Sequence, residues 1–254
     1  MTANSDARPR TGILRRLRRG RRIKAAPLMN PYQSFFYDVA NLLLRCAFRL
    51  LSNVEVVGVE NVPRSGRLIV IGNHTSWLDP ILVGAFIPRR IVFMSKKENF
   101  RNIFARFIVW SYGVFPVDRG NVDRSALNRT DEIMTAEGAL GMFPEGTRSR
   151  TGELRRAKAG TALVALRHNA PILPVSIVGA HRGLFTQLFH LRRPRFRLII
   201  GKPFTLPQVE GEVLNKETLT RLSDELMRPL AANLPEEQRG YYGIFPRVTD
   251  KHAE

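Results

Sequence analysis

From residue 66 onward, short apolar runs alternate with longer segments in which apolar positions recur at helical spacing. The apolar runs predict buried strands, and the segments between them predict helices. The predicted strands are Leu68–Ile71, Ile91–Met94, Val114–Val117, Leu140–Phe143, Ile172–Val178 and Phe196–Ile200. The predicted helices are Pro80–Ile87, Ile103–Trp110, Asp123–Ala136, Ala157–His168 and Thr218–Leu230. This alternation is typical of a single α/β domain with a mixed, mainly parallel sheet flanked by helices.

A further helix is predicted before this domain, over Pro31–Ser52. Its polar residues recur every three or four positions and form one stripe: Ser34, Asp38, Asn41, Arg45, Arg49 and Ser52. Aromatic and aliphatic residues fill the opposite side, so the helix is strongly amphipathic. Two interpretations compete at this point. The apolar face either packs on the core of the domain or lies among the headgroups of a membrane.

Charge adds to the second interpretation. The chain has 254 residues and a formal net charge of +18. Residues 1–24 hold nine basic residues and one acidic residue, a net charge of +8. We interpret residues 1–28 as a disordered basic tail, 29–55 as a membrane-associating amphipathic helix, and 56–254 as the globular domain. Such a surplus suits an anionic membrane, phosphorylated small molecules or nucleic acid.

Two absences narrow the protein class. Cys46 is the only cysteine, which excludes an internal disulfide and makes a cytosolic location natural. No stretch approaches the roughly 18–20 apolar residues that a spanning helix needs, so we expect a protein that lies on a membrane without crossing it. The basic tail lacks the apolar region of a secretory signal.

The first candidate for chemistry is His74, which directly follows a predicted strand. A histidine at that place is well suited to act as a general base, because its ordinary pKa lies near neutral. Asp79 comes five residues later and could accept from the other imidazole nitrogen, fixing the tautomer. An alternative exists for Asp79, because it precedes Pro80 and such a pair often starts a helix with the aspartate as N-cap.

The second candidate is the turn from Phe143 to Ser149, which follows another predicted strand. Pro144 ends the strand and Gly146 permits a sharp turn. Glu145, Thr147 and Arg148 then share one tight loop that can offer hydroxyl, main-chain N–H and guanidinium groups to a phosphate or an oxyanion. Glu145 is a candidate to receive a substrate hydroxyl. A plain surface turn is the alternative.

Lys96 and Arg119 also follow predicted strands. If these strands are parallel, both cations meet His74 and the Glu145 loop at one edge of the sheet. The edge would then combine a base, its acidic partner and several cations, which favours a phosphate-bearing substrate with a reactive hydroxyl. The five histidines are scattered without the spacing of metal ligands, and no nucleotide-binding glycine loop is present.

Four sequence blocks, taken in order, resemble those of the glycerolipid acyltransferase family, the bacterial 1-acylglycerol-3-phosphate acyltransferases. The blocks are Asn73–Asp79, Gly113–Arg119, Phe143–Ser149 and Pro171–Val175, within a motif core at 66–204. The resemblance implies the catalytic pair His74 and Asp79. It also implies that Arg119 and Arg148 bind phosphate, that Glu145, Gly146 and Thr147 belong to the site, and that Lys96 is a cleft lysine. Pro116 departs from the pattern, since the family usually has an aliphatic residue there.

The resemblance further implies direct transfer of a fatty acyl group to the free hydroxyl of lysophosphatidic acid, giving phosphatidic acid. The donor would be acyl-CoA or an acyl carrier protein, with no metal and no other cofactor. We expect a peripheral enzyme on the cytoplasmic face of the cell membrane. Two alternatives remain: acylation of another acceptor, such as glycerol 3-phosphate or a different lysolipid, and a non-catalytic basic protein that binds membrane or nucleic acid. No recognised nucleic-acid module is visible, so we expect no nucleic-acid partner.

Overall fold

The computed structural model of the chain describes residues 29–97, 112–117, 123–182, 187, 189–190, 192–208 and 215–243. Within these residues seven strands form one sheet in the order β1-β7-β6-β2-β5-β3-β4. The strands are β1 Asn53–Val57, β2 Leu68–Gly72, β3 Ile91–Lys96, β4 Phe115–Val117, β5 Ala139–Met142, β6 Ile172–Val178 and β7 Arg195–Ile200. All neighbours pair in parallel except β6 and β7, which are antiparallel. The expected α/β domain with a mainly parallel sheet is confirmed.

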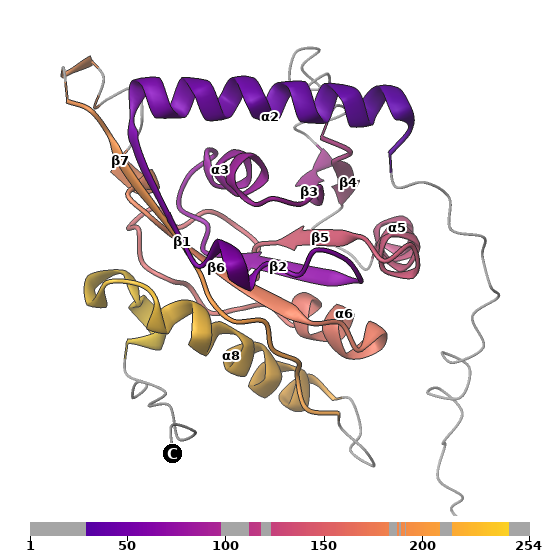
Figure 1. Cartoon of the computed structure of the whole chain (residues 1–254). Coiled ribbons are helices and arrows are strands. Elements are labelled where there is room, and N and C mark those ends of the chain that lie inside the picture. Colours follow the sequence, from indigo (N-terminus) through magenta and orange to yellow (C-terminus); the bar gives the residue numbers. More distant parts are fainter. Residues whose placement is uncertain are drawn as a thin grey trace, which may run out of the picture.

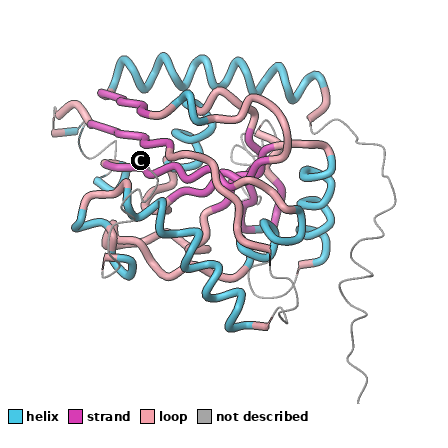
Figure 2. Tube along the Cα trace, turned by 60° about the horizontal axis from the view of Figure 1, so that its bottom comes forward, coloured by secondary structure: helices cyan, strands magenta, loops and turns pink. Residues whose placement is uncertain are grey.

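Helices cover the sheet from two sides. They are α2 Pro31–Leu51, α3 Asp79–Phe86, α5 Arg124–Thr135, α6 Gly160–His168 and α8 Lys216–Ala232. In Figure 1, α2 and α3 lie above the sheet, α6 and α8 lie below it, and α5 lies beside β5. The turned view of Figure 2 shows the strands side by side between these helices.

The central strand β2 shows why the sheet needs both helical layers. All five of its residues are buried. Leu68 and Val70 join the apolar cluster that contains α3, whereas Ile69 and Ile71 join the cluster that contains α6 and α8. Alternate side chains of a strand point to opposite faces, so a continuous apolar run requires cover on both.

Two differences from the predicted elements have simple causes. Strand β1 was not predicted, because it lies at the sheet edge and its residues alternate between half-buried and exposed. A single neighbouring strand, β7, accounts for its pairing. The predicted helix Ile103–Trp110 lies outside the described residues.

Helix α2 contacts the domain through a mixed face, in which Tyr37 and Phe48 are buried in the core beside polar residues. Asn41 is buried and accepts a hydrogen bond of 2.7 Å from the Tyr112 hydroxyl. Arg45 donates to the main-chain oxygen of Ala85, at the end of α3. The opposite face is exposed to solvent, and its large members are Tyr32, Phe35, Phe36, Val39, Leu42, Leu43 and Leu50. The helix thus packs on the core through Tyr37 and Phe48, while a second, larger apolar face is left outside the core.

Candidate active site

His74 and Asp79 lie at the carboxyl end of β2, where the chain turns into α3. The Nδ1 atom of His74 is 2.9 Å from Oδ2 of Asp79. Asp79 is fully buried, and the His74 side chain is 13% exposed. Because Nδ1 faces the aspartate, Nε2 is the nitrogen left to take a proton from a substrate. A base with a carboxylate on its far side is the arrangement expected from the sequence.

Asp79 also holds the turn that carries His74. Its Oδ2 accepts main-chain hydrogen bonds from Thr75 at 2.6 Å and from Ser76 at 2.7 Å. Both donors precede α3, whose N-cap position is Leu78 and has no side-chain capping bond. The expectation that Asp79 caps the helix is therefore wrong. Its carboxylate points back into the turn, where two N–H groups need an acceptor.

Glu145 fixes the same turn from the neighbouring strand β5. Its side chain is buried, and Oε1 accepts the main-chain N–H of His74 at 2.7 Å. Oε2 accepts the N–H of Arg155 at 2.9 Å. The N–H of Ser149 donates to the main-chain oxygen of His74 at 2.7 Å. Since main-chain donors engage both carboxylate oxygens, Glu145 positions His74, and its contact with a substrate hydroxyl stays a prediction.

Burial changes the acidity of Glu145. Removal from water raises its pKa from the ordinary 4.5 to about 7, although the hydrogen bonds from His74 and Arg155 act in the opposite direction. The nearby charge of Asp79 raises the pKa further. Near neutral pH this carboxyl group is therefore close to its titration midpoint.

The other residues of the turn take distinct places. Gly146 has φ +71°, and a Cβ there would meet the Lys158 side chain at 2.8 Å. Thr147 accepts a hydrogen bond of 2.6 Å from the guanidinium of Arg155. Arg148 is exposed and makes no hydrogen bond or ion pair with any residue that the structure describes. Its guanidinium is thus available to an anion.

The two remaining predicted cations differ in what the structure says of them. Lys96 is the last residue of β3, which is parallel to β5, so it lies at the same edge of the sheet as Glu145. Arg119 lies outside the described residues, two positions after the end of β4. Sequence reasoning did not single out the ring of Phe143, which stacks on His74 with centroids 4.3 Å apart.

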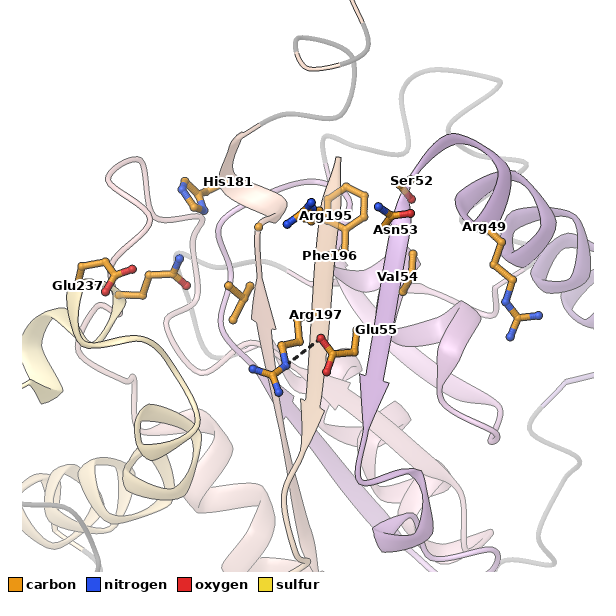
Figure 3. Close-up of a pocket in the computed structure, with 13 residues that line it drawn as sticks. Arg49, Ser52, Asn53, Val54, Glu55, His181, Arg195, Phe196, Arg197 and Glu237 are labelled. Atoms are coloured by element: carbon orange, nitrogen blue, oxygen red, sulfur yellow. Dashed lines mark ion pairs between the residues drawn. The ribbon is translucent and has the colours of Figure 1, made fainter. Parts of the chain in front are cut away.

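A pocket of about 580 Å³ lies at strands β1 and β7, beside the segment that follows α8 (Figure 3). None of the predicted site residues lines it. Two of its charged members, Arg197 and Glu55, form an ion pair of 3.2 Å across β7 and β1. Across the described part of the chain, no group of three His, Cys, Asp or Glu side chains could hold a metal ion.

Comparison with known proteins decides the family. The profile of the family described as Acyltransferase matches residues 53–178. A 1-acyl-sn-glycerol-3-phosphate acyltransferase of Bacillus subtilis is 30% identical over 185 residues, which cover 72% of this chain and 89% of that protein. The chain belongs to this acyltransferase family. It is an O-acyltransferase, and His74, Asp79 and the Glu145 loop all lie within the matched region.

Two further relatives agree. A 1-acyl-sn-glycerol-3-phosphate acyltransferase of Streptococcus pneumoniae is 24% identical over 213 residues, covering 82% of this chain and 76% of that protein. The crystal structure of the acyltransferase PlsC from Thermotoga maritima superposes with a TM-score of 0.58 at 23% identity, covering 78% of this chain and 80% of that one. The latter likeness shows that the fold is shared.

The raised pKa of Glu145 predicts a pH-dependent stability. Because the folded enzyme holds this proton more tightly than the unfolded chain, stability from this group is present below pH 4.5 and is lost as the pH rises to about 7. Relative to Glu145→Gln, which does not titrate, the wild type should lose on the order of 3 kcal/mol of unfolding free energy between pH 4 and pH 8. Urea unfolding at both pH values measures this.

A matched control is Glu153→Gln, which changes an exposed glutamate in the same loop. It should leave the pH dependence of unfolding as in the wild type. Parallel pH curves for the wild type and Glu145→Gln would contradict the account.

Proposed function

We propose that this acyltransferase moves a fatty acyl group from an acyl thioester to the free hydroxyl of 1-acylglycerol 3-phosphate, forming phosphatidic acid. The observation that carries the proposal is the 2.9 Å contact between His74 and the buried Asp79, in a member of the acyltransferase family. The relatives from Bacillus subtilis and Streptococcus pneumoniae bear the name of this activity.

In the proposed reaction, Nε2 of His74 takes the proton of the acceptor hydroxyl as its oxygen attacks the thioester carbonyl. The carbon–sulfur bond of the tetrahedral intermediate then breaks, and the imidazolium returns the proton to the departing thiolate. Asp79 orients the ring and stabilises its charged form. Main-chain N–H groups in the Glu145–Thr147 turn are the candidates to support the oxyanion. The donor would be acyl-CoA or an acyl carrier protein, with no metal or other cofactor.

Arg148 is our first candidate for the phosphate of the acceptor. It follows the loop that Glu145 ties to His74, and its guanidinium is exposed. A guanidinium offers two parallel donors to phosphate oxygens, which fixes direction as well as charge. Lys96, at the same sheet edge, and Arg119, which the family resemblance implies, are further candidates. A bound phosphate would hold the hydroxyl against the base and lower the entropic cost of attack.

An acceptor panel tests the reaction itself. Purified enzyme and a radiolabelled acyl-CoA or acyl carrier protein are incubated with 1-acylglycerol 3-phosphate, glycerol 3-phosphate and other lysolipids. We expect labelled phosphatidic acid as the main product, and loss of nearly all transfer in His74→Ala with an unchanged thermal midpoint. A preference for another acceptor would change the substrate assignment. Near wild-type transfer by His74→Ala would exclude His74 as the base.

Arg148→Ala should act on the acceptor selectively. We expect the KM for 1-acylglycerol 3-phosphate to rise about tenfold or more, because a charge-assisted contact is lost, while the KM for the donor stays unchanged. Arg67→Ala is the matched control, since Arg67 precedes β2 at the opposite edge of the sheet and bonds the main-chain oxygen of His168. Equal acceptor KM values in both variants would remove Arg148 from the phosphate site.

We also propose that the enzyme works on an anionic membrane surface, with α2 lying in the headgroup layer on the cytoplasmic side. The outward apolar face of α2 supports this proposal. A large apolar surface in contact with water is unfavourable, and burial in the headgroup layer of a membrane would remove it from water. The basic residues of the 1–24 segment would add attraction to anionic lipids. No described helix is long and apolar enough to span a bilayer.

A substitution on α2 tests the membrane contact. Leu42 and Leu43 are 61% and 65% exposed, so replacing both with Ser should leave the thermal midpoint nearly unchanged. Binding to vesicles of phosphatidylglycerol and phosphatidylcholine should weaken at least about tenfold, since two buried leucines are lost from the lipid. Leu163→Ser, on α6 across the sheet from α2 (Figure 1), is the control and should bind normally. Unchanged binding of the double variant would exclude the α2 face.

A further inference from the structure

Three aromatic rings lie in line beneath the active-site turn. The imidazole of His74 stacks on Phe143 with centroids 4.3 Å apart and planes 20° apart. Phe143 in turn lies nearly parallel to Phe93, with centroids 6.1 Å apart and planes 14° apart. The rings come from three neighbouring strands or their ends, β2, β5 and β3. We call Phe93, Phe143 and His74 the aromatic row.

Two strand glycines make room for the aromatic row. Gly141 pairs directly with Phe93 across β5 and β3, and a Cβ on Gly141 would lie 2.2 Å from the Phe93 ring. A Cβ on Gly72 would lie 3.2 Å from the ring of Phe143. Gly141 and Phe143 are two residues apart, as are Gly72 and His74, so each pair points to the same face of the sheet. The two phenylalanine rings thus each cross a strand at a glycine and reach the next ring.

These glycines stand where a parallel sheet normally favours bulky residues. Both lie in fully buried strands, β2 and β5. Glycine weakens a strand interior, and it commonly marks a place where another group must approach closely. Here the approaching groups are Phe93 and Phe143, and the end of their line is the imidazole of His74.

We infer that Phe143, backed by Phe93, is a positioning residue for the acyl transfer. Its ring supports one face of the imidazole while Asp79 holds Nδ1, so the plane and the rotation of the base are both fixed. An aromatic face also attracts a cation, so the row stabilises the imidazolium that forms when His74 takes the hydroxyl proton. Phe143 thus acts on the step in which His74 is protonated, and it does not bind the substrate.

This inference rests on the proposed function, since it needs His74 as the base. Phe143→Leu removes the ring and keeps an apolar side chain of similar reach. We expect kcat to fall roughly 10- to 100-fold, because both orientation and charge support are lost, with the KM of donor and acceptor within about twofold of wild type. Phe143→Tyr keeps the ring at this half-buried position and should restore kcat to within about threefold.

The control for lost packing is Phe196→Leu. Phe196 is a buried ring in β7 that packs edge to face with Phe48, and it belongs to the apolar cluster that also contains Phe93. The Phe196→Leu variant should have a lower thermal midpoint and a kcat near the wild-type value. Wild-type kcat in Phe143→Leu, or no rescue by Phe143→Tyr, would overturn the inference. If the wild type fails to acylate any acceptor, or His74→Ala remains active, the proposed function fails instead.

The glycines give a second, independent readout. Gly141→Ala should displace the Phe93 ring and lower kcat, because its Cβ would lie 2.2 Å from that ring. Gly72→Ala should lower kcat less, because its Cβ would lie 3.2 Å from the Phe143 ring. Gly160→Ala, which has no atom within 4 Å of its added Cβ, should match the wild type. If Gly141→Ala does not fold, Gly72→Ala decides the matter. Wild-type kcat in Gly72→Ala, with Phe143→Leu also unaffected, would contradict a role for the row.

Discussion

The architecture of the active site depends on the hydrogen bonds that converge on the His74 turn. A single buried oxygen, Oδ2 of Asp79, meets the imidazole and two main-chain N–H groups. From the next strand, Glu145 and Ser149 engage the N–H and the C=O of His74 itself. The base is therefore fixed at its main chain from β5 and at its ring from α3.

This arrangement explains why two distant sequence blocks belong together. Strands β2 and β5 are adjacent and parallel, so the segments that follow them leave the sheet side by side. The first segment supplies the base, and the second supplies the carboxylate that fixes it and the exposed Arg148. A mutation in the second block can thus act through the geometry of the first, without touching substrate.

Helix α2 both packs on the domain and presents an apolar face to the outside. Its contacts with the domain combine the buried rings of Tyr37 and Phe48 with polar contacts, such as the Tyr112–Asn41 hydrogen bond of 2.7 Å. The other large apolar side chains of the helix, such as Leu42 and Leu43, face outward. This exposed face is the basis of the proposal that the enzyme works at a membrane surface, where its lipid acceptor would be found.

Much of this could be predicted from the sequence. Apolar runs such as Ile172–Val178 predict the buried strands closely, because burial on both faces leaves an unbroken apolar signature. The edge strand β1 was missed, since one-sided pairing requires no such run. The sequence also left open what the apolar face of α2 contacts, because an amphipathic pattern shows that a helix has an apolar face but not what covers that face.

The candidate site divides in the same way. The pairing of His74 with Asp79 was predictable from spacing and resemblance. The role of Glu145 was not, because only the register of β5 against β2 brings its carboxylate to the His74 main chain. Phe143 was missed for a related reason. Its contact with the imidazole depends on the room left by Gly72, and a glycine at the end of a predicted strand does not indicate that a ring packs over it.

The most direct test of the account is the single-turnover rate of acyl transfer by Asp79→Asn at saturating acceptor and donor. The amide can still accept from the turn but cannot support a charged imidazole, so we predict a rate lower by about 1,000-fold or more, with acceptor affinity unchanged. A rate within about tenfold of the wild type, in a variant with the wild-type fold, would contradict the claim that Asp79 orients His74 as the base.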